Sequence, residues 1–137
     1  MNYVLTVSEL SKTAQTTSDT IRHYVRIGLL TPSRDPDNGY KLFSDDDIRK
    51  LKFICRAKGL GFTLRDIRII FNHSNDGLSP CPAVRDMIRQ RIDENRIKLA
   101  ELNRLQQRMD DALNSWKSMP DGEPDGDAIC HLIESIS

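Results

Sequence analysis

The chain has 137 residues, of which 38% are hydrophobic and 29% charged, enough for one small domain with an extension. Its zero net charge hides an asymmetry: residues 1–76 hold 12 Lys/Arg against 9 Asp/Glu, and residues 77–137 hold 8 against 11, which suits a nucleic-acid-binding part followed by an acidic one. With no signal-like start, no long apolar run and only three widely spaced cysteines, the composition argues against secretion and membrane insertion and predicts a cytoplasmic protein without a membrane partner.

Residues 6–28 carry two short helical patterns separated by a turn. Val7, Leu10 and Ala14 recur on one face of the first pattern, and Gln15-Thr16 interrupts it. Thr17 is a candidate N-cap of the second pattern, which Gly28 ends. Two helices joined by so short a turn are the helix-turn-helix signature, in which the start of the second helix faces the bases. An ordinary helical hairpin with a solvated face is the alternative for this stretch alone.

Residues 34–43 predict two short strands around a polar turn. Asn38-Gly39 is strong hairpin chemistry, because both residues accept a positive φ. After a helix-turn-helix, such a hairpin is typical of a wing that lies over the minor groove or the DNA backbone.

Candidate DNA contacts come from the second helix, the wing and the end of a later helix. Arg22 suits either a bidentate bond to guanine or a phosphate contact, and Tyr24 also falls on the apolar stripe of its helix. For Lys58, an ordinary exposed lysine is the alternative. The full set is Ser18, Arg22, His23, Tyr24, Arg34, Tyr40, Lys41 and Lys58.

Two further predicted helices should pack against the helix-turn-helix and support it. Ser44, followed by three aspartates, begins a pattern that runs to about Lys58, and Thr63 caps another that runs to about Phe71. Cys55 lies in the apolar part of the first and is expected to be a small buried residue. Residues 72–80 read as a loop.

From Pro82 to about Trp116 the chain has helical character without Gly or Pro, long enough for a helix of roughly 50 Å at ~1.5 Å per residue. Seven of ten heptad positions are apolar, which predicts a coiled-coil seam between two chains. A helix packed within one chain is the alternative. The heptad positions are Arg85, Ile88, Ile92, Asn95, Leu99, Leu102, Gln106, Met109, Leu113 and Trp116.

The last part of the chain has a linker-like segment, residues 118–126, followed by residues 127–137, which predict a short amphipathic helix lying against the long one. We therefore expect three parts: a DNA-binding head over residues 1–72, a dimerisation helix over 81–117 and an effector region over 118–137. The predicted fold class is mainly α.

The stretch TIRHYVRIGLLTPSRDPDNGYKLFSDDDIRKLKFICRAKGLGFTLRDI resembles the MerR family of bacterial transcription regulators. The family pattern has an IRYYE helix, a GLL-P-R exit, a G-Y/R wing, a D---L-FI---R-LGFSL--I helix pair and a long dimerisation helix. The resemblance covers nearly the whole chain and departs at His23 and Val25, where the family usually has Tyr and Glu. It implies a winged helix-turn-helix, an antiparallel coiled-coil homodimer, and distortion of a promoter spacer so that RNA polymerase can use both promoter elements.

Two cysteines are candidate sensors. Pro82 suits position N1 of the long helix, so Cys81 falls at or next to the N-cap, where the helix dipole favours the thiolate. Cys130 is followed by His131 and preceded by an acidic loop. In an antiparallel dimer, Cys81 of one subunit can meet Cys130 of the other. Two thiolates, together with His131 or a carboxylate, suit zinc, cadmium, lead or mercury.

The resemblance supports this site and also limits it. Metal-sensing members for divalent ions carry cysteines that match Cys81 and Cys130, whereas copper(I)-type members lack the first. The family usually has one or two further cysteines where Trp116, Lys117 and Ser118 stand here, so the ligand set and the metal stay open.

Four alternatives remain beside metal sensing. The same thiols suit a sensor of oxidants or electrophiles, or are simply a free surface thiol and a buried one. An enzyme using Cys81 with a histidine is a different class; with no acid–base constellation and no phosphate loop, we expect no catalytic residues. A pure coiled-coil module leaves the turn and wing unexplained.

Overall fold

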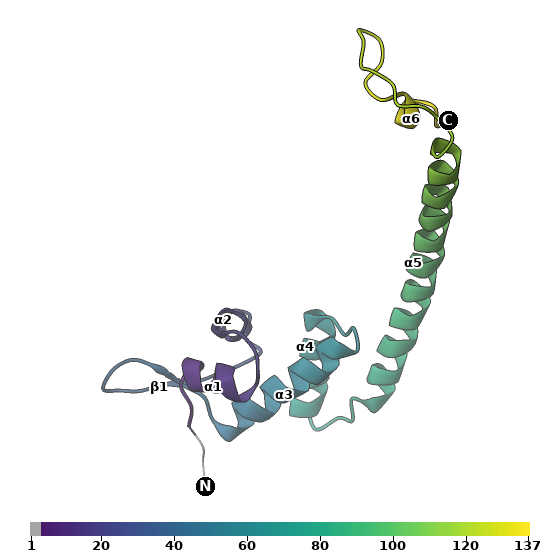
Figure 1. The fold of residues 1–137 in the computed structure, drawn as a ribbon. Helices are drawn as coiled ribbons and strands as arrows, with labels where there is room; N and C mark the ends of the chain where they lie inside the picture. The colour runs from purple at the N-terminus through teal and green to yellow at the C-terminus, as the bar shows by residue number, and fades with distance from the viewer. Residues whose placement is uncertain (1–3) are drawn as a thin grey trace. The chain divides into compact units, whose positions relative to one another are not determined.

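The computed structural model describes residues 4–137 and divides into two compact units, Met1–Arg91 and Ile92–Ser137. Figure 1 shows the elements in chain order, with the longest helix shared between the units. The elements are α1 (Val7–Thr13), α2 (Ser18–Arg26), β1 (Ser33–Arg34), β2 (Lys41–Leu42), α3 (Asp45–Gly59), α4 (Leu64–Asn75), α5 (Cys81–Trp116) and α6 (His131–Glu134).

Side chains cap the starts of the first two helices, and the cap of the second, Thr17, is the predicted one. Thr6 and Glu9 form a capping box at α1, and the Thr17 hydroxyl accepts a hydrogen bond from the Thr20 backbone N–H at α2. Between the helices Gln15 has a φ of 54°, a left-handed conformation that turns the chain sharply. The predicted helix-turn-helix is confirmed.

A single apolar core holds the first unit together. All of α1 to α4 and the segments between them contribute buried side chains, and Val84, Met87 and Ile88 of α5 pack against that core. This burial fixes the two helices of the helix-turn-helix relative to α3 and α4. The core residues are Leu10, Ile21, Tyr24, Leu29, Leu30, Phe43, Leu51, Ile54, Ala57, Phe62, Ile67 and Ile70.

The predicted hairpin is present as the antiparallel pair β1–β2, which projects from the helices of its unit (Figure 1). Its turn differs from the expected two-residue type. Gly39 has a φ of +73°, whereas Asn38 does not have a positive φ; instead, its side chain accepts a hydrogen bond from the Tyr40 backbone N–H at 2.9 Å. Asp35 closes the loop by donating its N–H to Tyr40 and accepting one from Gly39, both at 2.8 Å. The loop is thus longer than two residues and is stabilised by two backbone hydrogen bonds and by the bond that the Asn38 side chain accepts.

Helices α3 and α4 begin at the predicted caps, but two expectations for them are wrong. Helix α4 continues to Asn75, because nothing before Gly77, at a φ of +75°, interrupts it. Cys55 is exposed rather than buried. Leu51 and Ile54 set the inward face of α3, and Cys55, one position further, points away from it.

In the second unit the predicted seam is uncovered. No residue of α5 is buried, and the side chains of Ile92, Leu99, Leu102, Met109 and Leu113 are between 44% and 60% exposed. The rest of the described chain therefore does not bury these five side chains, whereas the alternative interpretation, a helix packed within one chain, required that burial.

The terminal helix is shorter than predicted. Helix α6 has four residues rather than the expected eleven, because the Asp125 carboxylate accepts hydrogen bonds from the backbone N–H groups of Asp127 and Ala128, both at 2.8 Å, and holds them in a turn. Ile136, just after α6, lines a small hollow with Met109 and Trp116 of α5. This accords with the expected contact between the terminal segment and the long helix.

Candidate functional site

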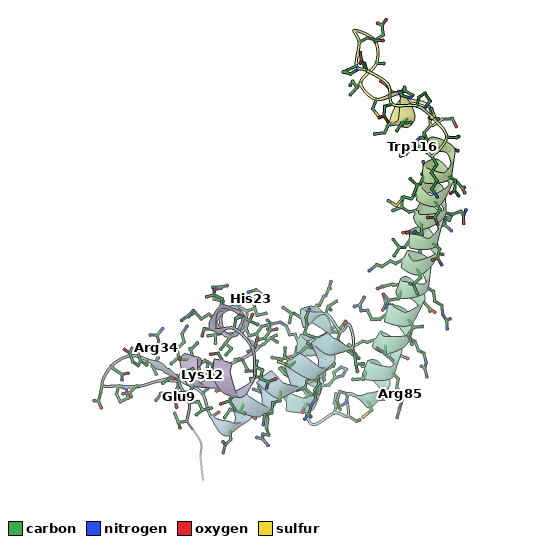
Figure 2. The ribbon with its side chains drawn as sticks, in the orientation of Figure 1. Glu9, Lys12, His23, Arg34, Arg85 and Trp116 are labelled. Carbon is green, nitrogen blue, oxygen red and sulfur yellow. The ribbon has the colours of Figure 1, made fainter. Side chains whose placement is uncertain are left out.

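The outer face of α2 presents the first group of predicted DNA contacts. Ser18 is the first residue of α2, and Arg22 and His23 are exposed one turn later. Figure 2 shows His23 pointing outward from α2. Arg22 forms an ion pair with Asp19 at 3.0 Å, and both side chains are at least half exposed. Such a surface pair is weak, so the guanidinium can exchange Asp19 for a phosphate or a base at little cost.

Tyr24 differs from its neighbours on α2. It is only 8% exposed and belongs to the core. Burial, with a smaller contribution from nearby Cys55, raises the pKa of its hydroxyl. The structure thus gives Tyr24 a packing role, which sets it apart from the exposed residues predicted with it.

The hairpin carries a second group. The Arg34 guanidinium donates a hydrogen bond to the Gly39 carbonyl at 3.3 Å, which ties the base of the loop to its tip. Arg34 can be followed at the base of the projecting loop in Figure 2. Tyr40 is 64% exposed, an unusual position for a large aromatic side chain, and Lys41 is half-buried. Lys58 is exposed in the last turn of α3.

Two contacts that the sequence analysis missed fix the end of α2. Arg68 of α4 donates a hydrogen bond to the carbonyl of Ile27, the C-cap of α2. The Thr31 backbone N–H donates to Asp47 Oδ1 at 3.1 Å, and Asp47 also completes the capping box of α3. The capping box is a local signal for Asp47, but no local signal marks Arg68, which lies 41 residues from its partner.

Cys81, the first of the two candidate sensor cysteines, lies at the start of α5, which is the position that the sequence predicts. Cys81 is the first helical residue, is exposed, and donates its backbone N–H to Ser79 Oγ at 3.3 Å. Pro80 accepts the first helical bond, from Val84 at 2.9 Å, and is therefore the N-cap. Pro82 is then at N2 rather than at the expected N1.

A largely apolar groove of about 510 Å³ lies beside Cys81. Arg56 of α3 and Arg85 of α5 add positive charge to its lining. The groove therefore suits a partner surface with apolar side chains and acidic neighbours. Its apolar lining comes mainly from Phe53, Ala57, Leu60, Phe62, Ile70 and Val84.

The second sensor group lies in the other unit. Cys130 is the N-cap of α6, His131 follows it, and both are half-buried at a hollow of about 370 Å³ that Asp121 and Glu123 also line. His131 packs closely on the loop: a Cβ atom added to Gly122 would lie 2.1 Å from His131 Nδ1. Only glycine permits this approach.

Cys130 and His131 are residue types that bind metal ions, but they are too few to hold an ion by themselves. A thiol and an imidazole suit soft and borderline ions, and the nearby carboxylates add negative charge. Across residues 4–137, however, no group of three or more His, Cys, Asp or Glu side chains is arranged to hold an ion. One chain alone does not assemble the predicted site.

None of the described helices combines the length and the apolar character needed to span a bilayer.

Two protein-family models match the chain. The model described as "MerR HTH family regulatory protein" matches residues 5–74, and the model described as "MerR, DNA binding" matches residues 48–112. Together they cover the helix-turn-helix, the wing, α3, α4 and most of α5.

Individual proteins are similar over almost the whole chain. The HTH-type transcriptional regulator ZntR of Escherichia coli is 33% identical over 134 residues, which span 95% of this chain and 90% of that protein. The heavy metal-dependent transcription regulator 2 of Rhizobium meliloti is 27% identical, over 97% of this chain and 86% of that protein. The crystal structure of the transcription regulator PbrR691 from Ralstonia metallidurans, in complex with lead(II), has the same fold, with a TM-score of 0.75 at 24% identity over 97% of this chain and 99% of that one.

Proposed function

Because the chain belongs to the MerR family of helix-turn-helix regulatory proteins, a family of transcriptional regulators and not of enzymes, we propose that it binds promoter DNA as a homodimer and responds to a soft or borderline metal ion. The observation that carries the DNA-binding role is the exposed pair of elements α2 and β1–β2 on one small core. On this proposal the protein acts in the cytoplasm, where promoter DNA lies.

The DNA surface of the proposal consists of α2 and the wing. Arg22 and His23 face the major groove from the start of α2, and Arg34 and Tyr40 reach the backbone or the minor groove from the hairpin. The first unit supplies only a modest positive charge, so a single head would bind weakly. Two heads in one dimer double the number of phosphate contacts and the salt dependence that goes with them.

The uncovered stripe on α5 supports the homodimer. Its side chains recur at heptad spacing, and a second copy of the same helix is the surface that matches such a stripe. The antiparallel arrangement follows from the family resemblance.

The metal site of the proposal is shared between two subunits. Cys130 and His131 of one subunit supply a thiolate and an imidazole, and Cys81 of the other supplies a second thiolate. The groove beside Cys81 is apolar with arginines in its lining, and residues 118–137 are acidic with Ile129 and Ile133 exposed, so the two surfaces are complementary. A bound zinc, cadmium, lead or mercury ion would supply bonds that tie the two chains together.

Tying the subunits in this way would change the angle between the two heads. Because the dimer is bound to both half-sites, a change in this angle would bend or twist the DNA between them. Such a deformation costs about 1–6 kcal/mol. The free energy of metal binding would offset that cost and align the promoter elements for RNA polymerase.

A thiol sensor of oxidants or electrophiles is the second candidate. The exposure of Cys81 favours this alternative, because an oxidant or electrophile can reach an exposed thiol. Here Cys81 and Cys130 would be oxidised or alkylated instead of binding an ion.

Transcription from a promoter that the protein binds, titrated with zinc, cadmium, lead, mercury and copper in turn, tests the proposal. We expect one or more of the first four ions to increase transcription under reducing conditions. A response to peroxide or diamide, but to no ion, would replace metal sensing with thiol sensing.

A further inference from the structure

Helix α4 contacts both the DNA-reading helix and the dimerisation helix through two charged side chains that are two positions apart. On one side, Arg68 donates a hydrogen bond to the Ile27 carbonyl at the end of α2. On the other, Asp66 accepts a hydrogen bond from Arg91 of α5. Ile67, between them in sequence, is fully buried in the core. A rigid helix thus joins α2 to α5.

The Asp66–Arg91 ion pair is short and mostly buried. Arg91 Nη2 lies 2.8 Å from Asp66 Oδ2, and the side chains are only 22% and 11% exposed. The same carboxylate oxygen accepts the Thr63 backbone N–H at 3.0 Å, so it is already held in the capping box of α4. Charge-assisted bonds to a carboxylate fixed in this way are short, directional and poorly screened by salt.

Arg91 occupies a specific place on α5. Val84, Met87 and Ile88 pack against the core of the head, and Arg91 follows at the same i, i+3, i+4, i+7 spacing. It is also the last residue of the first unit. The contact face of α5 therefore runs from apolar side chains to a single charged one at its end.

The two kinds of contact constrain α5 differently. Apolar packing is non-directional, so the three apolar side chains alone tolerate some rolling and sliding of α5 over the core. A hydrogen bond weakens steeply when its angle changes, so the Arg91 contact resists that rolling. The Arg91 contact lies at the end of the contact face, so it also limits rotation of α5 about the apolar contacts that precede it.

We propose that the Asp66–Arg91 ion pair sets the orientation of the DNA-reading head on α5, and thereby the spacing of half-sites that the homodimer accepts. The inference rests on the proposed homodimer and DNA role but not on the metal. In a dimer with twofold symmetry, any change in the orientation of the head on α5 occurs in both subunits. The distance between the two recognition helices is therefore sensitive to that orientation.

The experiment measures how strictly the dimer reads spacing. Operator duplexes are first selected with the parent protein from a pool of random sequences, and then lengthened by one or two base pairs at the centre. Affinities for each spacing are measured by fluorescence anisotropy without added metal. The variants are Arg91→Gln and Asp66→Asn, which remove one charge each. The control is Arg89→Gln, which removes a mostly exposed pair, Arg89–Asp86 at 3.1 Å, from the same helix.

We expect the parent to lose about tenfold or more in affinity on lengthened operators, because an altered spacing must be met by deforming the DNA. Arg91→Gln and Asp66→Asn should lose less than about threefold on the same operators, while Arg89→Gln behaves like the parent. Parent-like discrimination in a folded Arg91→Gln variant would overturn the inference. So would an equal loss of affinity at every spacing, because that points to a purely structural pair.

Folding is checked by thermal unfolding of each variant. Arg91→Lys is measured alongside, because it keeps a positive charge beside the buried carboxylate and avoids leaving it without a cation. We expect it to fold like the parent and to discriminate spacing less strictly, since lysine cannot reproduce the guanidinium geometry. Parent-like discrimination in Arg91→Lys together with Arg91→Gln would reject the inference. If the parent itself is monomeric or selects no operator, the proposed function fails before any variant is compared.

Discussion

The Asp47 carboxylate accepts a hydrogen bond from the Thr31 backbone N–H at 3.1 Å and so joins the exit from α2 to the first turn of α3. Asp47 is 2% exposed and also forms the capping box with Ser44. One buried side chain therefore fixes both the end of the helix-turn-helix and the start of the helix beneath it.

Replacing Asp47 should destabilise the head. Asp47→Ala leaves the N–H groups of Thr31 and Ser44 without their partner, and the loss of a cap together with a buried bond is worth about 2–4 kcal/mol. Urea unfolding measures this change. Asp46→Ala is the control, because Asp46 is half exposed and forms only surface pairs with Arg49 and Lys50, so it should change stability by less than about 1 kcal/mol. Equal effects of the two changes would contradict this account.

Removing the α2 guanidinium should weaken DNA binding without unfolding the head. Arg22→Ala loses a base or phosphate contact, which is worth about 1–3 kcal/mol. Arg49→Ala is the matched control, because Arg49 also forms an exposed i,i+3 pair with an aspartate but lies on α3. Binding isotherms at several salt concentrations measure both. Tyr40→Ala should likewise weaken binding, and parent-like affinity in both Arg22→Ala and Tyr40→Ala would mean that the DNA surface is misassigned.

Acid should release the contact between α4 and α5. Burial alone would raise the pKa of Asp66, but the hydrogen bonds from Arg91 and Thr63 outweigh it and hold the pKa below its usual value. A carboxyl group with a lowered folded-state pKa adds stability above its unfolded pKa of about 3.9 and loses it as the pH falls further. Stability from this pair should therefore be constant near neutral pH and fall below about pH 4. In Asp66→Asn, urea unfolding between pH 3 and pH 7 should show a smaller acid loss than in the parent.

The three cysteines provide a matched set for the sensor. Cys81→Ser and Cys130→Ser should keep promoter affinity within about twofold and lose the response to metal, because serine replaces a soft thiolate by a hard hydroxyl. Cys55→Ser should respond normally, since Cys55 is exposed on α3 and takes no part in the proposed site. Transcription with and without the effective ion measures the response. Normal activation in both Cys81→Ser and Cys130→Ser would remove the metal hypothesis.

A charge in the α5 seam should separate the subunits. Leu102 is 60% exposed in the single chain, so burying the exposed part of two copies in a dimer contributes roughly 2–4 kcal/mol. Leu102→Glu should therefore raise the dissociation constant by on the order of 100-fold or more, as measured by sedimentation. Asn103→Glu adds the same charge beside the seam and should remain dimeric. A monomeric parent would refute the dimer before either variant is made.

Local chemistry explains how much of the fold was predictable. Thr6, Thr17, Ser44 and Thr63 each cap a helix through bonds that span only a few residues, so the sequence pattern alone locates the helix starts. The predicted end of α4 and the predicted length of the last helix were wrong. Apolar periodicity does not show that a polar segment continues a helix, as at the end of α4, or that it forms a turn, as at Asp125.

Long-range contacts were beyond sequence reasoning. Arg68 meets the Ile27 carbonyl across 41 positions, and Arg91 meets Asp66 across 25, with no pattern that pairs them. The cysteines were singled out by their places beside helix starts and by the family resemblance. Their assembly into one site remains a proposal, because it needs a second chain.

The close approach of His131 to Gly122 also bears on how such regulators diverge from one another. Any side chain at position 122 would displace the imidazole, since even a methyl group would overlap Nδ1. Related chains that keep the Cys130-His131 pair but lose this glycine must place the ring elsewhere. If His131 binds the ion as proposed, such chains should differ in their choice among ions, so a residue with no donor atom in its side chain would help to decide which ion is detected.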